Sequence, residues 1–250
     1  MLKILLSLLL LCGAARAQVS MLISSQAATG GTPISLVGHA ICQAEVDNGS
    51  NANCTTAPID CHLANFVHVS VTNGGTSIIS VETISDSSGN TPYLHGTEQT
   101  YSTYNSLNQY WFENPMVSSS MTFTITGAAA VLPIISASCW ANVATSSVKD
   151  QEAVAMDMAT TLSTGPLTPL SPNELIITSF SAAPPTLGTQ SQLAPTGFTA
   201  LDARDGVSAN SVGLHTAYQI QTTATPVTPV WDSASNVTTL RVLGQAISFK

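Results

Sequence analysis

The amino-acid sequence predicts an all-β protein, a two-sheet antiparallel sandwich of jelly-roll type. Apolar and polar residues alternate with a period of two along much of the chain, which is the pattern of half-buried strands. Polar clusters rich in Gly, Asn and Ser separate these alternating segments and indicate turns. Hydrophobic residues make up 44% of the chain and charged residues only 8%, a balance typical of a chain with a packed core. Strands at this spacing favour a sandwich over a helical fold.

Residues 1–17 have the pattern of an export signal. Lys3 precedes an apolar run at residues 4–11, and Ala15-Arg16-Ala17 offers the small residues that a signal peptidase requires. The run is too short to span a bilayer, so no membrane span is expected. A lipoprotein signal at Cys12 is less favoured, because the bulky Leu11 precedes it. We therefore expect a secreted, extracellular or periplasmic protein whose residues 18–250 form a single β-sandwich domain.

The charge of the chain excludes one large class of partner. The formal net charge is −8, and removal of the signal with Lys3 and Arg16 makes it −10 for the mature chain. Nucleic acid binding needs a patch of Lys and Arg, and anionic membrane surfaces attract the same residues. The basic residues that remain form no cluster: Lys149, Arg204, Arg241 and Lys250. We therefore predict no nucleic acid partner.

The first alternating segments set the strand pattern. Val67, Val69 and Val71 share one face of a strand that ends at the turn residues Asn73-Gly74-Gly75. The same reasoning predicts further strands at residues 77–85, 121–125, 131–143, 174–181, 214–220 and 238–249. Three prolines within residues 163–172 predict an extended surface loop inside the domain.

One segment has the spacing of a helix. Val154, Met158 and Leu162 lie four residues apart within residues 148–162, and residues four apart share one face of an α-helix. We predict a helix there.

Four cysteines remain after processing, and an even number in an exported chain predicts two disulfides. Of the three connectivities, we prefer Cys54 with Cys61, which closes a small polar loop within a cysteine-containing segment at residues 42–61, and Cys42 with Cys139. A zinc site with His39 and His62 is the alternative, but the spacing fits none of the usual zinc frameworks.

Four segments carry recognisable strand and turn motifs: residues 65–71 (Asn-Phe-Val-His-Val-Ser-Val), residues 84–91 (Ile-Ser-Asp-Ser-Ser-Gly-Asn-Thr), residues 111–112 before 121–125, and residues 173–177 (Asn-Glu-Leu-Ile-Ile). In this order they resemble a broad group of bacterial secreted β-sandwich domains found in extracellular, adhesin-like proteins. The resemblance covers residues 65–250. It implies the same fold and an adhesive or carbohydrate-associated role. Cys139 stands where the group has an acidic residue, and residues 42–61 have no counterpart in it.

Aromatic residues are concentrated between residues 93 and 112. Tyrosine suits sugar stacking, because one ring face is apolar while the hydroxyl stays wet. Ordinary core packing is the alternative, and we expect Trp111 and Phe112 to lie inside. The candidate ligand-binding residues are Tyr93, Tyr101, Tyr104 and Tyr110.

Asp86, Ser88 and Asn90 place alternating oxygen ligands around Gly89. Hard cations prefer oxygen ligands, so calcium is the one cofactor that the sequence suggests. The alternative is a hairpin turn in which the Asp and Asn side chains bond their own backbone.

Two pairs of carboxylates, Asp150 with Glu152 and Asp202 with Asp205, have the close spacing that glycosidases use. Both lie in polar segments and are interpreted as solvated, and no Gly-x-Ser-x-Gly elbow occurs. We predict a non-catalytic secreted or surface-exposed β-sandwich, adhesive or carbohydrate-binding, with a glycan or cell-surface partner. The alternatives are a secreted carbohydrate-active hydrolase and a structural subunit of a surface assembly, which exposed edge strands would favour.

Overall fold

The computed structural model divides into two compact units, Met1–Pro33 and Ile34–Lys250, and the second unit carries the fold described below. The described residues are 32–44, 53–75, 83–91, 93–101, 105–126, 131–183, 192–206, 212–233 and 241–250. The signal segment at residues 1–17 and Tyr104 lie outside them. No helix within these ranges is long and apolar enough to cross a membrane.

The all-β fold class is confirmed, and every pairing between strands is antiparallel. The first large sheet has the order β1-β9-β3-β7-β5, with β6 also paired to β7; its strands are β1 (Ser35–Gln43), β9 (Val131–Ala141), β3 (Phe66–Gly75), β7 (Asn105–Glu113), β5 (Leu94–His95) and β6 (Gln99–Tyr101). The second large sheet has the order β10 (Lys149–Met158), β17 (Arg241–Phe249), β12 (Glu174–Ala183), β15 (Gly213–Gln221) and β14 (Thr199–Arg204).

Two small sheets complete the fold. The first small sheet has the order β2 (Asn53–Thr55), β8 (Phe123–Thr126) and β4 (Thr83–Asp86), and the second has the order β11 (Thr161–Ser163), β16 (Val230–Ser233) and β13 (Gln192–Leu193). The strands of the described residues thus form four sheets, where we predicted two. The jelly-roll connectivity stays a prediction.

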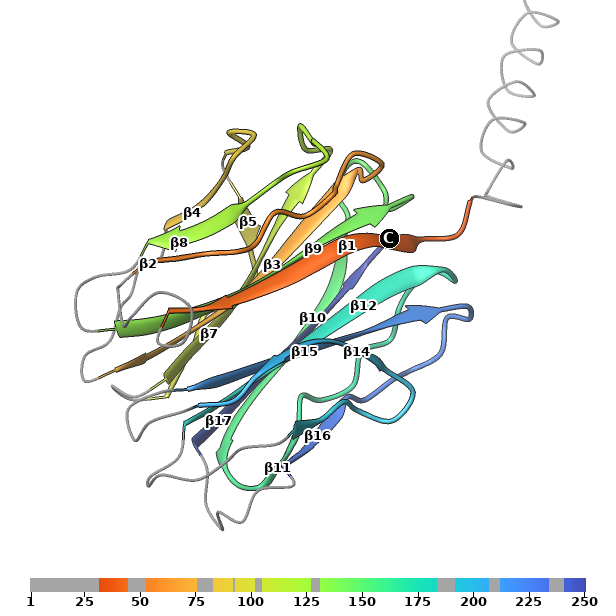
Figure 1. Cartoon of the computed structure of the whole chain (residues 1–250). Helices are drawn as coiled ribbons and strands as arrows, with labels where there is room; N and C mark the ends of the chain where they lie inside the picture. The colour runs from red at the N-terminus through yellow and green to blue at the C-terminus, as the bar shows by residue number, and fades with distance from the viewer. Residues whose placement is uncertain are drawn as a thin grey trace, which may run out of the picture. The chain divides into compact units, whose positions relative to one another are not determined.

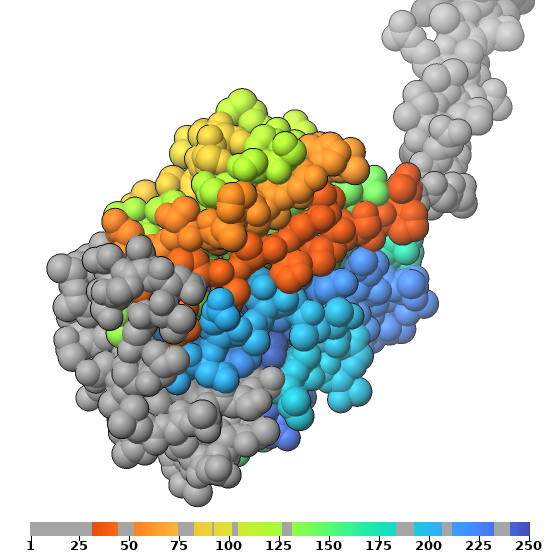
Figure 2. Space-filling model, in the orientation of Figure 1, coloured from red at the N-terminus to blue at the C-terminus, as the bar shows by residue number. Residues whose placement is uncertain are grey.

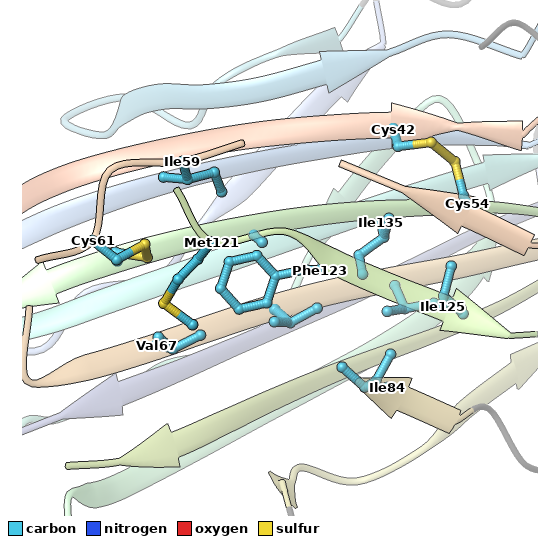
Figure 3. Close-up of a cluster of buried hydrophobic side chains, with 14 of the residues drawn as sticks. Cys42, Cys54, Ile59, Cys61, Val67, Ile84, Met121, Phe123, Ile125 and Ile135 are labelled. Carbon is cyan, nitrogen blue, oxygen red and sulfur yellow. A yellow bond between two sulfur atoms is a disulfide. The ribbon is translucent and has the colours of Figure 1, made fainter. Parts of the chain in front are cut away.

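The four sheets stack as layers, with the two large sheets in the middle and a small sheet outside each of them (Figure 1). One core cluster lies between the first small and first large sheets, where Phe123 and Met121 pack on Val67 and Ile135 (Figure 3). A second cluster, which includes Trp140, lies between the two large sheets, and further clusters fill the remaining interfaces.

Strand β3 is buried on both faces, and its alternation explains how the layers meet. Val67, Val69 and Val71 belong to the core beside the first small sheet, as the sequence predicts. Phe66 packs in the core between the two large sheets. On the same face, Ser70 Oγ lies 2.6 Å from Ser179 Oγ of the second large sheet. The interface between the large sheets is therefore partly polar and hydrogen-bonded.

The two halves of the unit repeat one arrangement of strands. The order β1-β9-β3-β7 of residues 35–141 corresponds to β10-β17-β12-β15 of residues 149–249, and β2-β8-β4 corresponds to β11-β16-β13. Each half also has one isolated bridge, Ile59–Met121 in the first and Leu167–Val227 in the second. Both first strands have an irregularity near their start, at residues 36–38 in β1 and 149–151 in β10. The protein is built from two structurally equivalent halves.

Equivalent positions of the two halves meet at the central interface. Phe66 of β3 lies opposite Trp140, just as Leu175 of β12 lies opposite Phe249. Trp140 makes an edge contact with Tyr218, with ring centroids 4.9 Å apart, and Phe249 makes the corresponding contact with Trp111 at 5.5 Å. The reciprocal contacts indicate an approximate two-fold relation between the halves.

The predicted helix at residues 148–162 is wrong, because that segment forms β10 and β11. Residues four apart share a face in a strand as well as in a helix, so the spacing of Val154 and Met158 fits both. Ala153 and Ala155, between the larger side chains, pack against cores beside the second small sheet. The small size of these two residues hid the period-two pattern.

The preferred disulfide pairing is also wrong, although all four cysteines are paired. Cys42 bonds Cys54, and Cys61 bonds Cys139. The amide of Cys61 donates to the carbonyl of Ser118, which holds the 59–61 segment over the first large sheet near Cys139 of β9. Cys42 at the end of β1 then meets the short strand β2. Figure 3 shows the Cys42–Cys54 bond at the edge of one core cluster, to which Cys61 and Cys139 also belong.

Candidate functional site

The Asp86 carboxylate occupies a tight turn after β4. Its Oδ1 accepts hydrogen bonds from the amides of Ser88 at 2.8 Å and Asn90 at 3.3 Å, and its Oδ2 accepts them from Asn90 Nδ2 at 3.0 Å and the Tyr93 hydroxyl at 2.5 Å. Asn90 also bonds both backbone groups of Met116. These contacts are those of the turn alternative. Calcium binding stays an untested prediction.

No group of three or more His, Cys, Asp or Glu side chains that could hold a metal ion occurs within the ranges that the structure describes. The four cysteines of the zinc alternative are consumed by the two disulfides. His62 instead lies 2.6 Å from Asp60 Oδ1, and this hydrogen bond lowers the pKa of Asp60.

The candidate tyrosines do not converge on one surface. Tyr93 and Tyr110 are half-buried and pack on the core beside the first small sheet, where the Tyr93 ring lies 5.5 Å from that of Phe112. Burial and the hydrogen bond to Asp86 raise the pKa of the Tyr93 phenol. Tyr101 is half-buried on the other face of the sheet, in a cluster between the two large sheets. Trp111 is buried as expected.

The carboxylates Asp150 and Glu152 engage different partners because a bulge separates them. The register of β10 shifts between Lys149 and Gln151, which breaks the alternation that would align the two acids. Asp150 Oδ2 accepts from the amide of Leu170 at 2.9 Å. Glu152 Oε1 accepts from Thr97 N at 2.5 Å and from Gln245 Nε2 at 2.6 Å, and Oε2 pairs with Lys149 Nζ at 2.5 Å.

These contacts set the ionisation of Glu152. Burial by itself raises the pKa of Glu152, but the hydrogen bonds from Lys149, Thr97 and Gln245 outweigh it and lower the pKa. Glu152 is thus held as an anion. A glycosidase needs one protonated and one ionised acid, so an ionised Glu152 fits the role of base or nucleophile but not that of the acid.

Sequence reasoning missed one polar cluster at the contact between the two halves. Strand β1 lies against residues of the second half in Figure 2. His39 Nδ1 lies 3.0 Å from Asp202 Oδ1, and Ser136 Oγ donates to Asp202 Oδ2 at 2.7 Å. The His39 side chain is 39% exposed and that of Asp202 only 7%. The one feature of the sequence that pointed to this cluster was the close spacing of two acidic residues, Asp202 and Asp205.

The chemistry of this cluster is limited by its geometry. In a serine triad the imidazole stands between the acid and the hydroxyl, whereas here the Asp202 carboxylate stands between His39 and Ser136. Asp202 orients the imidazole, but the hydroxyl is bonded to the acid and not to the base. Asp205 has a separate partner, His215 Nε2 at 3.0 Å. The two acids therefore contact two different histidines.

A row of apolar side chains is exposed along β10. Val154, Met156 and Met158 are 38%, 52% and 52% exposed, and β10 has β17 as its single strand partner among the described strands. When β10 and β1 are aligned at the bulge that each strand has near its start, Val154 and Met156 correspond to Ile41 and Gln43 of β1.

The equivalent positions on β1 are better covered. Ile41 packs on a core cluster, and Gln43 donates to the carbonyl of Asp205, just beyond β14. Strand β14 runs six residues, whereas its counterparts β5 and β6 have two and three residues. The shorter counterparts explain why the β10 row is exposed.

Comparison with known proteins gives no relative to set beside this geometry. No protein-family model matches the chain, and no curated protein and no solved structure is significantly similar to it.

Proposed function

We propose that this protein is a non-catalytic, extracellular β-sandwich that acts as a structural or adhesive subunit, and that it associates with a second copy of itself through the edge of β10. The observation that carries the proposal is the exposed row Val154, Met156 and Met158 on a strand with one strand partner among the described strands. Native sheets usually protect their edges with charge, proline or a covering segment, and an apolar edge is a template for strand pairing.

The sequence of β10 is complementary to itself. Antiparallel pairing of two copies about a two-fold axis at Ala155 places Val154 opposite Met156 of the second copy, and Met156 opposite its Val154. In the same register Asp157 faces Ala153 of the second copy, so no like charges lie opposite each other across this pairing. The contact would join two five-stranded sheets into one of ten strands.

The folded chain already contains a contact of the same kind, because its two halves pack against each other. Its two equivalent halves meet through equivalent residues, as the Ser70–Ser179 and Thr72–Ser181 contacts illustrate. A contact made by one strand edge lies at the small end of protein interfaces, so we expect a dissociation constant on the order of 10 μM.

The test is sedimentation velocity of the mature chain over a concentration series across the micromolar range. Wild type and the control Leu193→Lys should associate with concentration, because Leu193 is 61% exposed but lies on the second small sheet. Met156→Lys should remain monomeric, since it puts a charge into the proposed contact. A wild type that is monomeric throughout, or a Met156→Lys variant that associates like wild type, would refute the proposal.

A glycan array of the same three proteins and of Tyr101→Ala separates adhesion to sugar from self-association. We expect no binding that depends on Met156. Glycan binding that is lost in Tyr101→Ala, from a protein that stays monomeric, would replace self-association with the carbohydrate-binding function.

A further inference from the structure

Two acidic side chains meet beneath the proline-rich loop at residues 164–173. Glu174 begins β12 and is fully buried, and the Asp150 side chain on β10 is 2% exposed. Strand β17 lies between these two strands, and the two carboxylates accept hydrogen bonds from consecutive amides of the loop, those of Leu170 and Ser171. A change in the protonation of two acids this deeply buried has structural consequences.

Both acids hold the same loop. Asp150 Oδ2 accepts from the amide of Leu170 at 2.9 Å, and Glu174 Oε1 accepts from the amide of Ser171 at 3.0 Å. The neighbouring Gln151 Oε1 accepts from Thr168 N at 2.7 Å. Prolines at positions 166, 169 and 172 have no N–H to donate. These side chains therefore supply much of the loop's attachment to the second large sheet.

The charges around the pair do not balance if both acids are ionised. Glu174 Oε2 is buried and accepts no hydrogen bond from the residues that the structure describes. The cation facing the pair is Lys250 at the end of β17, whose Nζ lies 3.4 Å from Asp150 Oδ1 and whose side chain is 42% exposed. The other polar neighbours, Gln151 and Ser248, are neutral. Lys149 engages Glu152 instead.

We propose that Asp150 and Glu174 share one proton in the folded protein, and that this proton makes the attachment of the 164–173 loop sensitive to pH. The shared proton supplies the donor that Glu174 Oε2 lacks and removes the repulsion between the two carboxylates. When it is lost, two buried anions face each other with a single exposed lysine beside them. The loop amides at Leu170 and Ser171 are then held less firmly.

The pKa of Glu174 in the folded chain decides whether stability rises or falls with pH. Burial and the Asp150 charge raise the pKa of Glu174 above its ordinary value, so the folded chain binds the proton more tightly than the unfolded chain. The stabilisation is fully present below the ordinary glutamate pKa of about 4.3 and is lost as pH rises through the raised value. This is the opposite of the usual behaviour of a paired carboxylate.

Hydrogen exchange at the Leu170 and Ser171 amides, measured between pH 5 and pH 8, tests this proposal. After correction for the intrinsic rate, protection in wild type should fall with rising pH, by about tenfold for each pH unit by which the folded pKa exceeds the ordinary one. Glu174→Gln should hold its protection constant, because its amide N–H replaces the shared proton permanently. Glu98→Gln, an exposed position, is the matched control and should behave as wild type.

Two results would overturn the proposal. One is the same pH dependence of protection in wild type and Glu174→Gln, with Asp150→Asn as the second variant if Glu174→Gln does not fold. The other is a change in the wild-type profile on adding calcium or a chelator, which would mean that a cation and not a proton lies between the acids.

Discussion

Lowering the pH from 7 to 4 should destabilise the protein through one buried residue, His68. Its side chain is 1% exposed on β3, and its Nε2 lies 3.0 Å from Gln109 Oε1. Gln109 Nε2 donates to Ser179 Oγ at 3.0 Å and to the carbonyl of Gln245 at 2.9 Å. Because both amide hydrogens are used, Oε1 must face His68, and this fixes the proton of the neutral imidazole on Nε2.

The size of this loss in stability follows from the shift in the pKa of His68. Burial lowers the pKa of His68 from 6.5 to about 4, and the hydrogen bond to Gln109 opposes this only in part. The folded pKa is depressed, so the stabilisation is fully present above pH 6.5 and is lost as pH falls to about 4. At 1.36 kcal/mol per pH unit the loss is on the order of 3 kcal/mol. This is a large fraction of the 5–15 kcal/mol that typically separates folded from unfolded states.

Urea unfolding followed by tryptophan fluorescence, at a series of pH values from 4 to 7.5, measures the effect. His68→Leu should be less stable than wild type at pH 7 by about 1–3 kcal/mol, because Gln109 Oε1 loses its donor. That deficit should shrink or reverse at pH 4, since leucine cannot be protonated. His95→Gln, at an exposed histidine, should follow wild type. The reasoning is refuted if wild type and His68→Leu lose the same free energy between pH 6.5 and pH 4.

Four further variants test a close packing contact, the two disulfides and a buried hydrogen bond. Gly38→Ala should cost about 1–3 kcal/mol in thermal or urea unfolding, because its Cβ would lie 2.8 Å from Ile59 Cγ2; unchanged stability would contradict the close contact. Replacing Cys61 and Cys139 together by Ala should cost about 4.5 kcal/mol and the shorter disulfide about 3 kcal/mol, from loops of 78 and 12 residues; the reverse ranking in urea unfolding would contradict the chain-entropy argument. Tyr93→Phe should cost about 1.5–3 kcal/mol, since it removes a hydrogen bond to a carboxylate, and a neutral result would mean that solvent replaces the hydroxyl.

The strands that the sequence predicts correctly are those with large apolar residues at every second position. Val67, Val69 and Val71 fall on β3, and the predictions at 174–181 and 214–220 fall within β12 and β15. Each has one or both faces buried, so burial and alternation agree. The predicted strand at 77–85 overlaps β4 only at its end, and the rest of it lies outside the described residues.

The strands that the sequence missed owe their pairing to neighbours distant in the chain. Strand β2 has three residues, and its middle residue, Cys54, lies opposite Ile125 of β8. Strand β14 carries the polar residue Asp202, whose carboxylate contacts His39 of β1. A short or polar segment shows no periodicity by itself, and the sheet beside it supplies its hydrogen bonds.

The sequence also predicts candidate sites formed by neighbouring residues better than sites formed by residues distant in the chain. The sequence predicts that Asp86 and Asn90 act together, because the turn that joins them is local. It did not predict that Asp150 would meet Glu174, since the two are separated by 24 positions and their contact depends on the bulge in β10 and on β17 lying between them. The aromatic cluster at residues 93–112 was compact in the sequence, but Tyr101 and Tyr110 lie on opposite faces of one sheet.

By itself the sequence determined the fold class and the pairing of all four cysteines in disulfides, because period-two alternation and an even cysteine count are local or compositional properties. Tertiary structure alone decided the disulfide partners, the β10 edge and the duplication of the fold. The two halves share their strand order but not their residues, as Trp140 and its counterpart Phe249 illustrate. A core specifies volume and polarity at each position more strictly than residue identity, so the same architecture recurs without a repeat that the sequence displays.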